Sequence, residues 1–436
     1  MSGVDTIYAL SSGGMPSGVA VVRISGGAVA AVAEIVCGGL PAARYASLRP
    51  IRSRNGELLD EGLVIYFPGP ASFTGEDVLE IHLHGSRAVA AAVLSELAGF
   101  TGLRMAEAGE FSRRAYLNGK KDLAAVEGLA DLIAAETEAQ RRFAQGNSSG
   151  VQSRLYQSWR QRIIDMRSLI EAELDFADEG DIAGSVSDLV WVDAARLVDE
   201  IRGHLAGFKR AEIVLDGFKV VLAGAPNAGK SSLLNALAKR DAAIVSDEPG
   251  TTRDLVDVSL DLGGMKVVLT DTAGIRDEPG RVEKIGIERA RQRIFEADLV
   301  VELVDLSNPA DVGLQCSAPV LRVGSKKDMA AGMVAGLDAS ISIDDEGSVV
   351  RLLDVIEQRA FAAGLRSGEI APSRIRHVGL LSICSDQLEK ACGMVGGLEL
   401  KAEHLRRAGD ALGMITGSIG VEDMLDVIFS RFCIGK

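Results

Sequence analysis

The sequence predicts a multidomain protein: an N-terminal α+β domain, a split all-α helical domain, and an α/β P-loop domain inserted between the two helical parts. Three observations carry this prediction. Short β-branched runs that end at Gly or Pro lie in the first part of the chain. A stripe of apolar residues at helical spacing follows. A strand then leads into a glycine-rich loop and a helix.

The first domain is expected over residues 1–118. Its strands are predicted in GVAVVRISG (18–26), EGLVIYFPGP (61–70) and DVLEIHLHG (77–85). His82 and His84 share one face of the last strand, as two metal ligands would. Because the sequence offers no third ligand at useful spacing, we interpret them as packing or dimer-interface residues.

The helical domain is expected over 119–216 and 373–436. Its clearest signal is an apolar stripe with spacings of 3 and 4 residues, formed by Leu155, Trp159, Ile163, Met166, Ile170 and Leu174. Helical periodicity returns after the polar segment 366–374 and continues to residue 436.

The inserted domain is expected over 217–372. Its strands are predicted within 218–232, 265–274, 298–305 and 318–328, with helical segments between them. Such alternation is typical of a doubly wound α/β domain.

Composition excludes a disordered chain and limits the kinds of partner. Hydrophobic residues make up 47% of the 436 residues, and the net charge is −14. A uniformly acidic surface repels nucleic acid, so basic patches or a partner protein would have to bring RNA in. Aromatic residues are only 4%, which makes base readout by stacking a weak expectation.

The N-terminal segment lacks the basic residues of a signal peptide, and no apolar run approaches the length of a membrane span. We therefore expect a cytoplasmic protein without a membrane span. The five cysteines have no CxxC spacing, which argues against a disulfide framework and a zinc ribbon.

A phosphate-binding loop is predicted at residues 224–231, because GAPNAGKS matches GxxxxGK[ST] between a strand and an apolar helix. Backbone N–H groups of such a loop surround the β-phosphate. Lys230 would neutralise the β- and γ-phosphate oxygens, and the Ser231 hydroxyl would ligate Mg²⁺.

Two further motifs follow in order. PGTTRD (249–254) offers Thr252, or with less support Thr251, as a switch hydroxyl for Mg²⁺. DTAG (271–274) places Asp271 on the water shell of Mg²⁺ and the Gly274 N–H near the γ-phosphate. Together with the P-loop, these motifs resemble a GTPase of the translation-factor-related class.

Guanine selection is assigned to residues 325–328, with sequence SKKD. Asp328 can accept hydrogen bonds from guanine and Lys326 can cover the ring. Ser325 stands where such GTPases usually carry Asn, which shortens a bridging contact.

Hydrolysis needs a group to orient water, because Ile275 stands where many GTPases have Gln. Asn227 and the loop 242–252 could form an oxygen cage for a monovalent cation in place of an arginine finger. Glu283 is a candidate for the water-orienting group, although a solvated helix residue would look the same.

The blocks GAPNAGKSSLLNAL, EPGTTRD, DTAGIR, VEKIGIERA and the terminal CIGK, with the N-terminal blocks around 5–26, 70–85 and 109–123, resemble the MnmE (TrmE) family of tRNA modification GTPases. The resemblance spans residues 5–436. Carried onto this chain, it implies GTP binding by Asn227, Ala228, Gly229, Lys230, Ser231, Ser232, Ser246, Thr251, Thr252, Asp271, Thr272, Ala273, Gly274, Ser325, Lys326 and Asp328.

The resemblance also implies ions and a cofactor. Ser231 and Thr252 would bind Mg²⁺. A K⁺ cage would take Asn227, Ser246, Glu248 and Thr251, and Glu283 would orient the water. A 5-formyl-tetrahydrofolate or related tetrahydrofolate would bind Arg23, Glu80, Lys120 and Lys436 in the N-terminal domain. Cys433 could take part in one-carbon chemistry or merely belong to a tail anchor.

As a member of such a family, the chain would be a homodimer and would form a heterotetramer with the flavoprotein MnmG (GidA). The two would add an aminomethyl-type group to C5 of wobble uridine 34, and tRNA would be bound largely by the partner. One alternative is a ribosome-assembly or other RNA-associated GTPase without folate chemistry, for which a basic C-terminal module is expected and is not found. A second is a folate-dependent one-carbon transferase whose GTPase activity is purely regulatory.

Overall fold

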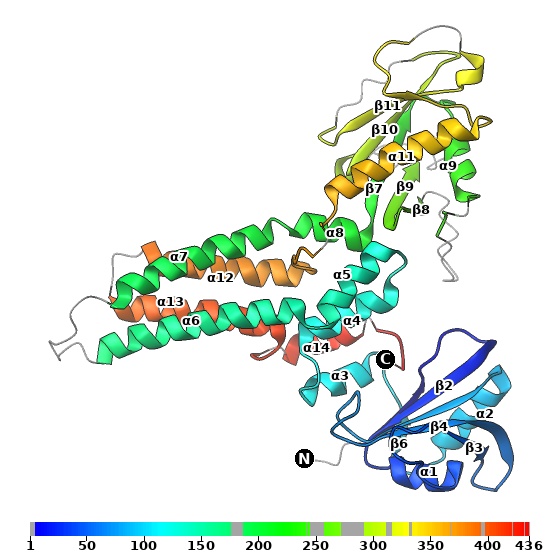
Figure 1. The fold of residues 1–436 in the computed structure, drawn as a ribbon, viewed down its shortest axis with the longest axis vertical. Helices are drawn as coiled ribbons and strands as arrows, with labels where there is room; N and C mark the ends of the chain where they lie inside the picture. The colour runs from blue at the N-terminus through cyan, green and yellow to red at the C-terminus, as the bar shows by residue number, and fades with distance from the viewer. Residues whose placement is uncertain are drawn as a thin grey trace, which may run out of the picture. The chain divides into compact units, whose positions relative to one another are not determined.

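The structure is a computed structural model, drawn as a ribbon in Figure 1. It describes residues 5–175, 186–240, 242–244, 257–271, 292–310, 316–330, 334–366, 368–393, 397–420, 422–430 and 432–435. These residues form two compact units, one within 1–130, 153–160 and 410–436, the other within 131–152 and 161–409. The domain boundaries after 118, 216 and 372 stay predictions.

The N-terminal domain is built on a six-stranded sheet with the order β3-β4-β5-β2-β1-β6. β1 and β6 are parallel and the other neighbours are antiparallel. Its elements are β1 (Thr6–Leu10), β2 (Ser17–Ser25), α1 (Val29–Cys37), β3 (Ser47–Arg52), β4 (Leu58–Phe67), β5 (Val78–Gly85), α2 (Arg87–Ala98), β6 (Leu103–Met105) and α3 (Glu110–Leu117).

The two faces of this sheet have different neighbours, since successive strand residues point to opposite sides. Ala20, Val22 and Ile24 of β2 are buried against apolar residues of α1 and α2. Arg23 therefore lies on the opposite face. On that face, a small cluster that includes Ile7 and Phe111 covers part of the sheet.

The helical part confirms the predicted apolar stripe. Trp159, Ile163, Met166 and Ile170 are buried on α6, and α12 packs against α7. The helices are α4 (Leu123–Ala134), α5 (Glu138–Ser148), α6 (Val151–Asp175), α7 (Val186–Leu205), α8 (Phe208–Asp216), α12 (Ile375–Gly393), α13 (Leu398–Thr416) and α14 (Glu422–Phe429).

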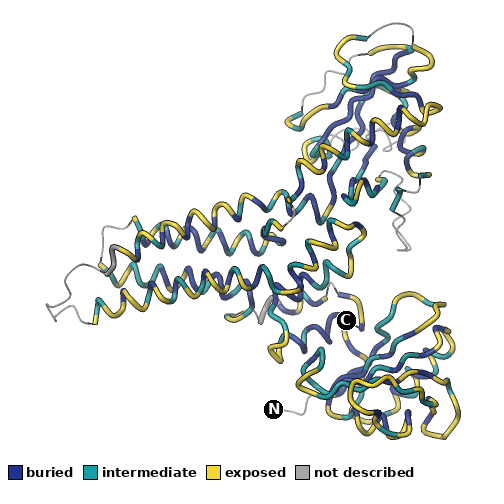
Figure 2. The backbone as a smooth tube through the Cα atoms, in the orientation of Figure 1, coloured by how far each residue is buried: buried dark blue, intermediate teal, exposed yellow. Residues whose placement is uncertain are grey.

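The inserted domain contains a second six-stranded sheet, with the order β12-β11-β10-β7-β9-β8. All neighbours are parallel except β8 and β9. Figure 2 shows its central strands as buried. The elements are β7 (Phe218–Gly224), α9 (Lys230–Ala238), β8 (Asp257–Leu262), β9 (Met265–Asp271), β10 (Leu299–Asp305), β11 (Val320–Ser325), the short 3₁₀ helix η2 (Lys327–Met329), β12 (Ala339–Ser340) and α11 (Glu346–Ala363).

The order in which strands are added to the sheet switches sides at β7: β9 lies on one side of β7, and the next strand, β10, lies on the other. In open α/β sheets, ligands bind at the carboxyl ends of the strands at such a switch point. The loop after β7 is therefore where the fold alone would place a ligand. The architecture confirms the predicted fold class.

Several strands were not predicted: β1, β3, β6, β8 and β12. β3 is an edge strand with the sequence SLRPIR, in which proline and exposed charges hide the alternation. β6 and β12 have three and two residues, too short for a periodic signal.

Candidate functional site

The P-loop connects β7 to α9 at the switch point of the inserted sheet. Gly224 has φ +142, and a Cβ there would lie 2.4 Å from the carbonyl oxygen of Leu303 on β10. Only glycine allows the strand to turn so close to its neighbour. Asn227 is exposed and has φ 65, so the loop bends away from an extended path before α9 begins.

Lys230 is buried at the first position of α9 and folds back over the loop. Its Nζ donates to the carbonyl oxygens of Gly224 (2.8 Å) and Ala225 (2.9 Å). Burial lowers the pKa of Lys230, and the negative charge of Asp271 opposes that effect. Within the described part of the chain, Lys230 has no carboxylate in ion-pair contact, so phosphate oxygens can supply its counter-charge.

A serine hydroxyl and a carboxylate meet beside the loop. Ser231 Oγ donates to Asp271 Oδ2 at 2.6 Å, and Asp271 is buried at the end of β9. The sequence predicted both residues as part of a Mg²⁺ site. Their oxygen atoms are the ligand type that Mg²⁺ prefers, so this pair fits the ion.

A cavity of about 240 Å³ opens next to the loop. Its lining includes Gly229, Ser325, Lys326, Asp328 and Ser342. Three of these residues belong to the segment to which the sequence assigned guanine selection. Asp328 is exposed on η2, where its carboxylate is accessible to a ligand.

Lys326 is held by a carboxylate that the sequence analysis missed. Its Nζ donates to Asp305 Oδ2 at 2.5 Å. Burial acts to raise the pKa of Asp305, but Lys326 and Ser307 outweigh it and hold that pKa at about 2. The signal that could have found Asp305 is its place at the carboxyl end of a buried strand.

Ser325 connects the cavity to the P-loop. It is buried, and its hydroxyl donates to the carbonyl oxygen of Ala228 at 2.7 Å. The shorter side chain therefore still reaches the P-loop backbone. Ser232 lines the same cavity.

Nine candidate residues lie outside the described residues: Ser246, Glu248, Thr251, Thr252, Thr272, Ala273, Gly274, Glu283 and Lys436. Their predicted roles in water orientation and in Mg²⁺, K⁺, nucleotide and folate binding stay predictions.

A second group of charged residues lies on the N-terminal sheet. Arg23 of β2 and Glu80 of β5 are cross-strand neighbours. The Arg23 Nε and Nη2 atoms donate to Glu80 Oε1 at 3.0 and 2.8 Å. The two side chains are 23% and 17% exposed, so the pair is accessible from one side.

Aromatic and imidazole groups surround this pair. The rings of Phe73 and Phe111 each have their centroid 5.7 Å from the Arg23 guanidinium carbon. His82 Nε2 lies 3.3 Å from Glu80 Oε2. The two phenylalanines were missed in the sequence because neither lies in a charged motif.

The interpretation of His82 and His84 as packing or dimer-interface residues stays a prediction. His84 Nδ1 lies 2.8 Å from Asp60 Oδ1 on β4. Among the described residues, no group of three or more His, Cys, Asp or Glu could hold a metal ion.

The C-terminal tail lies against the N-terminal sheet. Ser11 Oγ donates to the carbonyl oxygen of Gly435 at 2.8 Å, and Ile434 forms a bridge with Ala108. Gly435 approaches Leu10, which is next to Ala9, the β1 partner of Arg23. The thiol-bearing residue Cys433 is exposed.

Lys120 is exposed just after α3. It lies beside the turn at Gly75, where an added Cβ would come within 3.3 Å of the Lys120 Cγ atom. No described helix is long and apolar enough to cross a membrane.

The fold and the P-loop define the class: a P-loop GTPase whose G domain is inserted into a helical domain that follows an α+β domain. Family models identify the other parts. The model for the TrmE N-terminus matches residues 6–120, and the model for the MnmE helical domain matches residues 123–433.

Named relatives agree with these matches. The chain is 57% identical to the tRNA modification GTPase MnmE of Mesorhizobium japonicum over 99% of both chains. It is 56% identical to MnmE of Chelativorans sp., over 99% of this chain and 98% of that protein. The chain belongs to the MnmE family of tRNA modification GTPases.

Solved structures give weaker likenesses. Era from Aquifex aeolicus is 23% identical, with a TM-score of 0.26, over 39% of this chain and 66% of that one. The G domain of the FeoB iron transporter from T. maritima is 25% identical, with a TM-score of 0.24, over 33% and 97%. Both TM-scores are too low to support an assignment. The family assignment rests on the family models and the named relatives.

Proposed function

We propose that this chain is a potassium-activated GTP hydrolase that acts in the cytoplasm with an MnmG-type flavoprotein. Together they would add an aminomethyl-type group to C5 of wobble uridine 34 in tRNA, with a tetrahydrofolate as one-carbon donor. The observation that supports the proposal is that one chain contains both a P-loop, with Ser231 bonded to Asp271, and a partly exposed Arg23–Glu80 pair.

The nucleotide site supplies positioning and electrostatic stabilisation. Lys230 can exchange two backbone carbonyls for phosphate oxygens, and the N–H groups at the start of α9 point to the same place. Ser231 and Thr252 would bind Mg²⁺, and Asp271 would bind its water shell; the ion would neutralise charge that develops on the phosphates. Lys326 and Asp328 would bind guanine at the cavity rim.

Two further roles in hydrolysis rest on residues outside the described part of the chain. Glu283 would orient the attacking water. Asn227 would contribute its side-chain oxygen to a K⁺ site with Ser246, Glu248 and Thr251. Asn227 is exposed on the P-loop, a place from which its amide can reach a cation beside the phosphates.

The charged residues on the N-terminal sheet have the chemistry that a tetrahydrofolate requires. A carboxylate can bind the two parallel N–H donors of the pterin ring, while Arg and Lys can bind its oxygen atoms or the glutamate tail. Arg23, Glu80 and Lys120 would do this, together with Lys436. When bound, the folate would carry the one-carbon unit, and the thiol of Cys433, which is exposed, would be available to take part.

The proposed partners are those that the family resemblance implies, and the net charge supports them. A net charge of −14 disfavours extensive contact with tRNA, so an MnmG-type partner would supply most of that surface. The active assembly would contain a homodimer of this chain.

The test is mass spectrometry of tRNA wobble uridines from a deletion strain. We expect the modified base to be lost, to return with the wild-type gene, and to stay absent with Lys230→Ala and with Arg23→Gln. Arg54→Gln is the matched control, because Arg54 also pairs with a glutamate of the N-terminal domain but lies on an exposed edge. If the deletion strain keeps the modified wobble uridine, the result would instead favour the ribosome-assembly alternative.

A further inference from the structure

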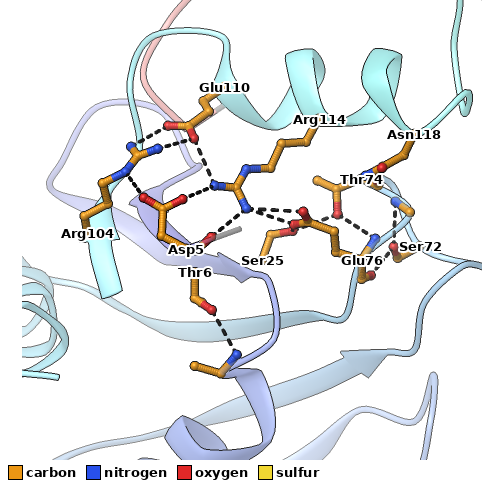
Figure 3. Close-up of polar contacts among 12 residues, drawn as sticks. Asp5, Thr6, Ser25, Ser72, Thr74, Glu76, Arg104, Glu110, Arg114 and Asn118 are labelled. Atoms are coloured by element: carbon orange, nitrogen blue, oxygen red, sulfur yellow. Dashed lines mark hydrogen bonds and ion pairs between the residues drawn. The ribbon is translucent and has the colours of Figure 1, made fainter. Parts of the chain in front are cut away.

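A buried arginine shares α3 with Phe111, one of the two rings beside Arg23, and among the described contacts it touches neither Arg23 nor Glu80. Arg114, on α3, is 6% exposed. Figure 3 shows its guanidinium surrounded by three carboxylates. It donates to Glu110 at 3.0 Å, to the Asp5 carboxylate at 3.1 Å and to the Asp5 carbonyl oxygen at 2.8 Å, and it pairs with Glu76 Oε2 at 3.1 Å.

Glu76 ends a loop that is tied down at several points. Ser25 Oγ donates to Glu76 Oε2 at 2.7 Å and also lies 2.7 Å from Thr74 Oγ1. Ser25 and Thr74 are fully buried. Asn118, just after α3, donates to the Thr74 carbonyl oxygen at 2.7 Å. The loop 72–76 is thus fastened to α3 on one side and to the end of β2 on the other.

This loop and α3 carry the two aromatic rings of the N-terminal site. Phe73 belongs to the loop and Phe111 to α3. Both rings lie 5.7 Å from the Arg23 guanidinium carbon, a distance at which a cation is attracted to the ring face. The direction in which Arg23 presents its donors therefore depends on where the loop and α3 are held.

The three carboxylates around Arg114 differ in whether they have a second cationic partner. Arg104 also pairs with Asp5 at 2.5 Å and with Glu110 at 2.6 Å. Among the described contacts, Glu76 has Arg114 as its one cationic partner. Loss of the guanidinium would therefore leave Glu76 without a compensating charge beside two other carboxylates, and the loop would move.

We infer that Arg114 is a positioning residue for the Arg23–Glu80 pair. It acts through Glu76, which fixes the loop that carries Phe73, and through α3, which carries Phe111. The inference rests on the proposed function, because it concerns the tetrahydrofolate site, and it adds a residue that contacts no ligand.

The test measures binding of 5-formyl-tetrahydrofolate by calorimetry with the full chain. Arg114→Gln is expected to weaken binding by about tenfold or more, the scale on which displaced groups lose function. Glu76→Gln removes the charge that pairs with Arg114 and also alters the group that accepts from Ser25, but it leaves Arg114 with Asp5 and Glu110. It should also weaken binding. Because Arg114→Gln already removes the Arg114–Glu76 ion pair that Glu76→Gln removes, the double variant should bind no more weakly than Arg114→Gln alone. Arg54→Gln is the matched control and should bind as the wild type does.

Hydrogen exchange separates positioning from general stability. We expect faster exchange in residues 68–76 and α3 of Arg114→Gln, with α2 unchanged. Faster exchange over the whole domain would make Arg114 a stability residue and overturn the inference. If Arg114→Gln does not fold, Glu76→Gln decides the matter by the same two measurements.

Arg23→Gln distinguishes the two levels of the proposal. If it loses binding while the Arg114 and Glu76 variants bind normally, the positioning role is wrong and the folate site stands. If Arg23→Gln binds as tightly as the wild type, the folate site itself is wrong, and the inference with it.

Discussion

The nucleotide site and the N-terminal site differ in the partners of their basic side chains. Lys230 donates to two neutral carbonyl oxygens, whereas Arg23 donates to the carboxylate of Glu80. Burial lowers the pKa of Lys230, which means that its charge is costly until an anion arrives. The Arg23–Glu80 pair is already balanced. The first site therefore favours a strongly anionic ligand, and the second a ligand with both donors and acceptors.

The two sites also differ in assembly. The P-loop comes from one continuous turn, and β9 adds Asp271. The described residues of the N-terminal site come from β2, β5, a loop and α3. The phosphate-binding part of the nucleotide site is made from one turn, so we expect it to tolerate changes elsewhere, whereas we expect the N-terminal site to depend on residues that never touch the ligand. Variants should reveal this difference.

The largest expected effect is on hydrolysis. Glu283→Ala should bind GTP nearly normally, because a group that only orients the attacking water makes no contact that contributes to the affinity for GTP. Turnover should fall by roughly 10²-fold or more. Single-turnover hydrolysis and nucleotide titration measure the two quantities.

Glu346→Ala, on an exposed position of α11, is the control and should hydrolyse GTP normally. Lost affinity in Glu283→Ala would make Glu283 a structural residue. Normal turnover would move the water-orienting role to another group.

The second prediction concerns the cation. GTP turnover should be at least about tenfold faster in K⁺ than in Na⁺, since a cation in the cage replaces the charge of an arginine finger. Asn227→Ala should remove most of this difference. Asn235→Ala, on an exposed position of α9, should keep it. Equal wild-type rates in the two salts would exclude the cage.

The third prediction concerns the N-terminal site. Glu80→Gln keeps the shape of the side chain but removes the charge-assisted bonds to Arg23, so binding of 5-formyl-tetrahydrofolate should weaken by about tenfold. Glu96→Gln breaks the comparable pair with Arg54 and should have no effect on it. Unchanged binding in Glu80→Gln would assign the ligand to other residues.

The smallest expected effect concerns Ser325. An Asn there could keep a contact with the P-loop and add one to guanine, worth on the order of 1 kcal/mol, or several-fold in affinity. Ser325→Asn should therefore bind GDP more tightly, which calorimetry can measure. Ser158→Asn, on an exposed position of α6, is the control. An unchanged affinity would mean that another residue already replaces the missing contact.

The contiguous site was largely predictable from the sequence. The order of strand, loop and helix at 218–238 was predicted, and so was the proximity of Ser231 to Asp271. This succeeds because the P-loop is local in the chain, and because parallel strands bring their carboxyl ends to one edge of a sheet. Asp305 lies at the same edge but was missed, since nothing local marks its contact with Lys326.

By itself, the sequence determined the fold class, the P-loop and the family, because each can be recognised from patterns among residues that are close together in the chain. Tertiary structure alone decided that Phe73 and Phe111 meet beside Arg23, that the tail residue Gly435 lies against Ser11, and that Arg114 pairs with Glu76. Ser11 and Gly435 are joined across 424 positions of the chain. No local pattern encodes such a contact, because the positions that meet are fixed only when sheet, helix and tail pack together.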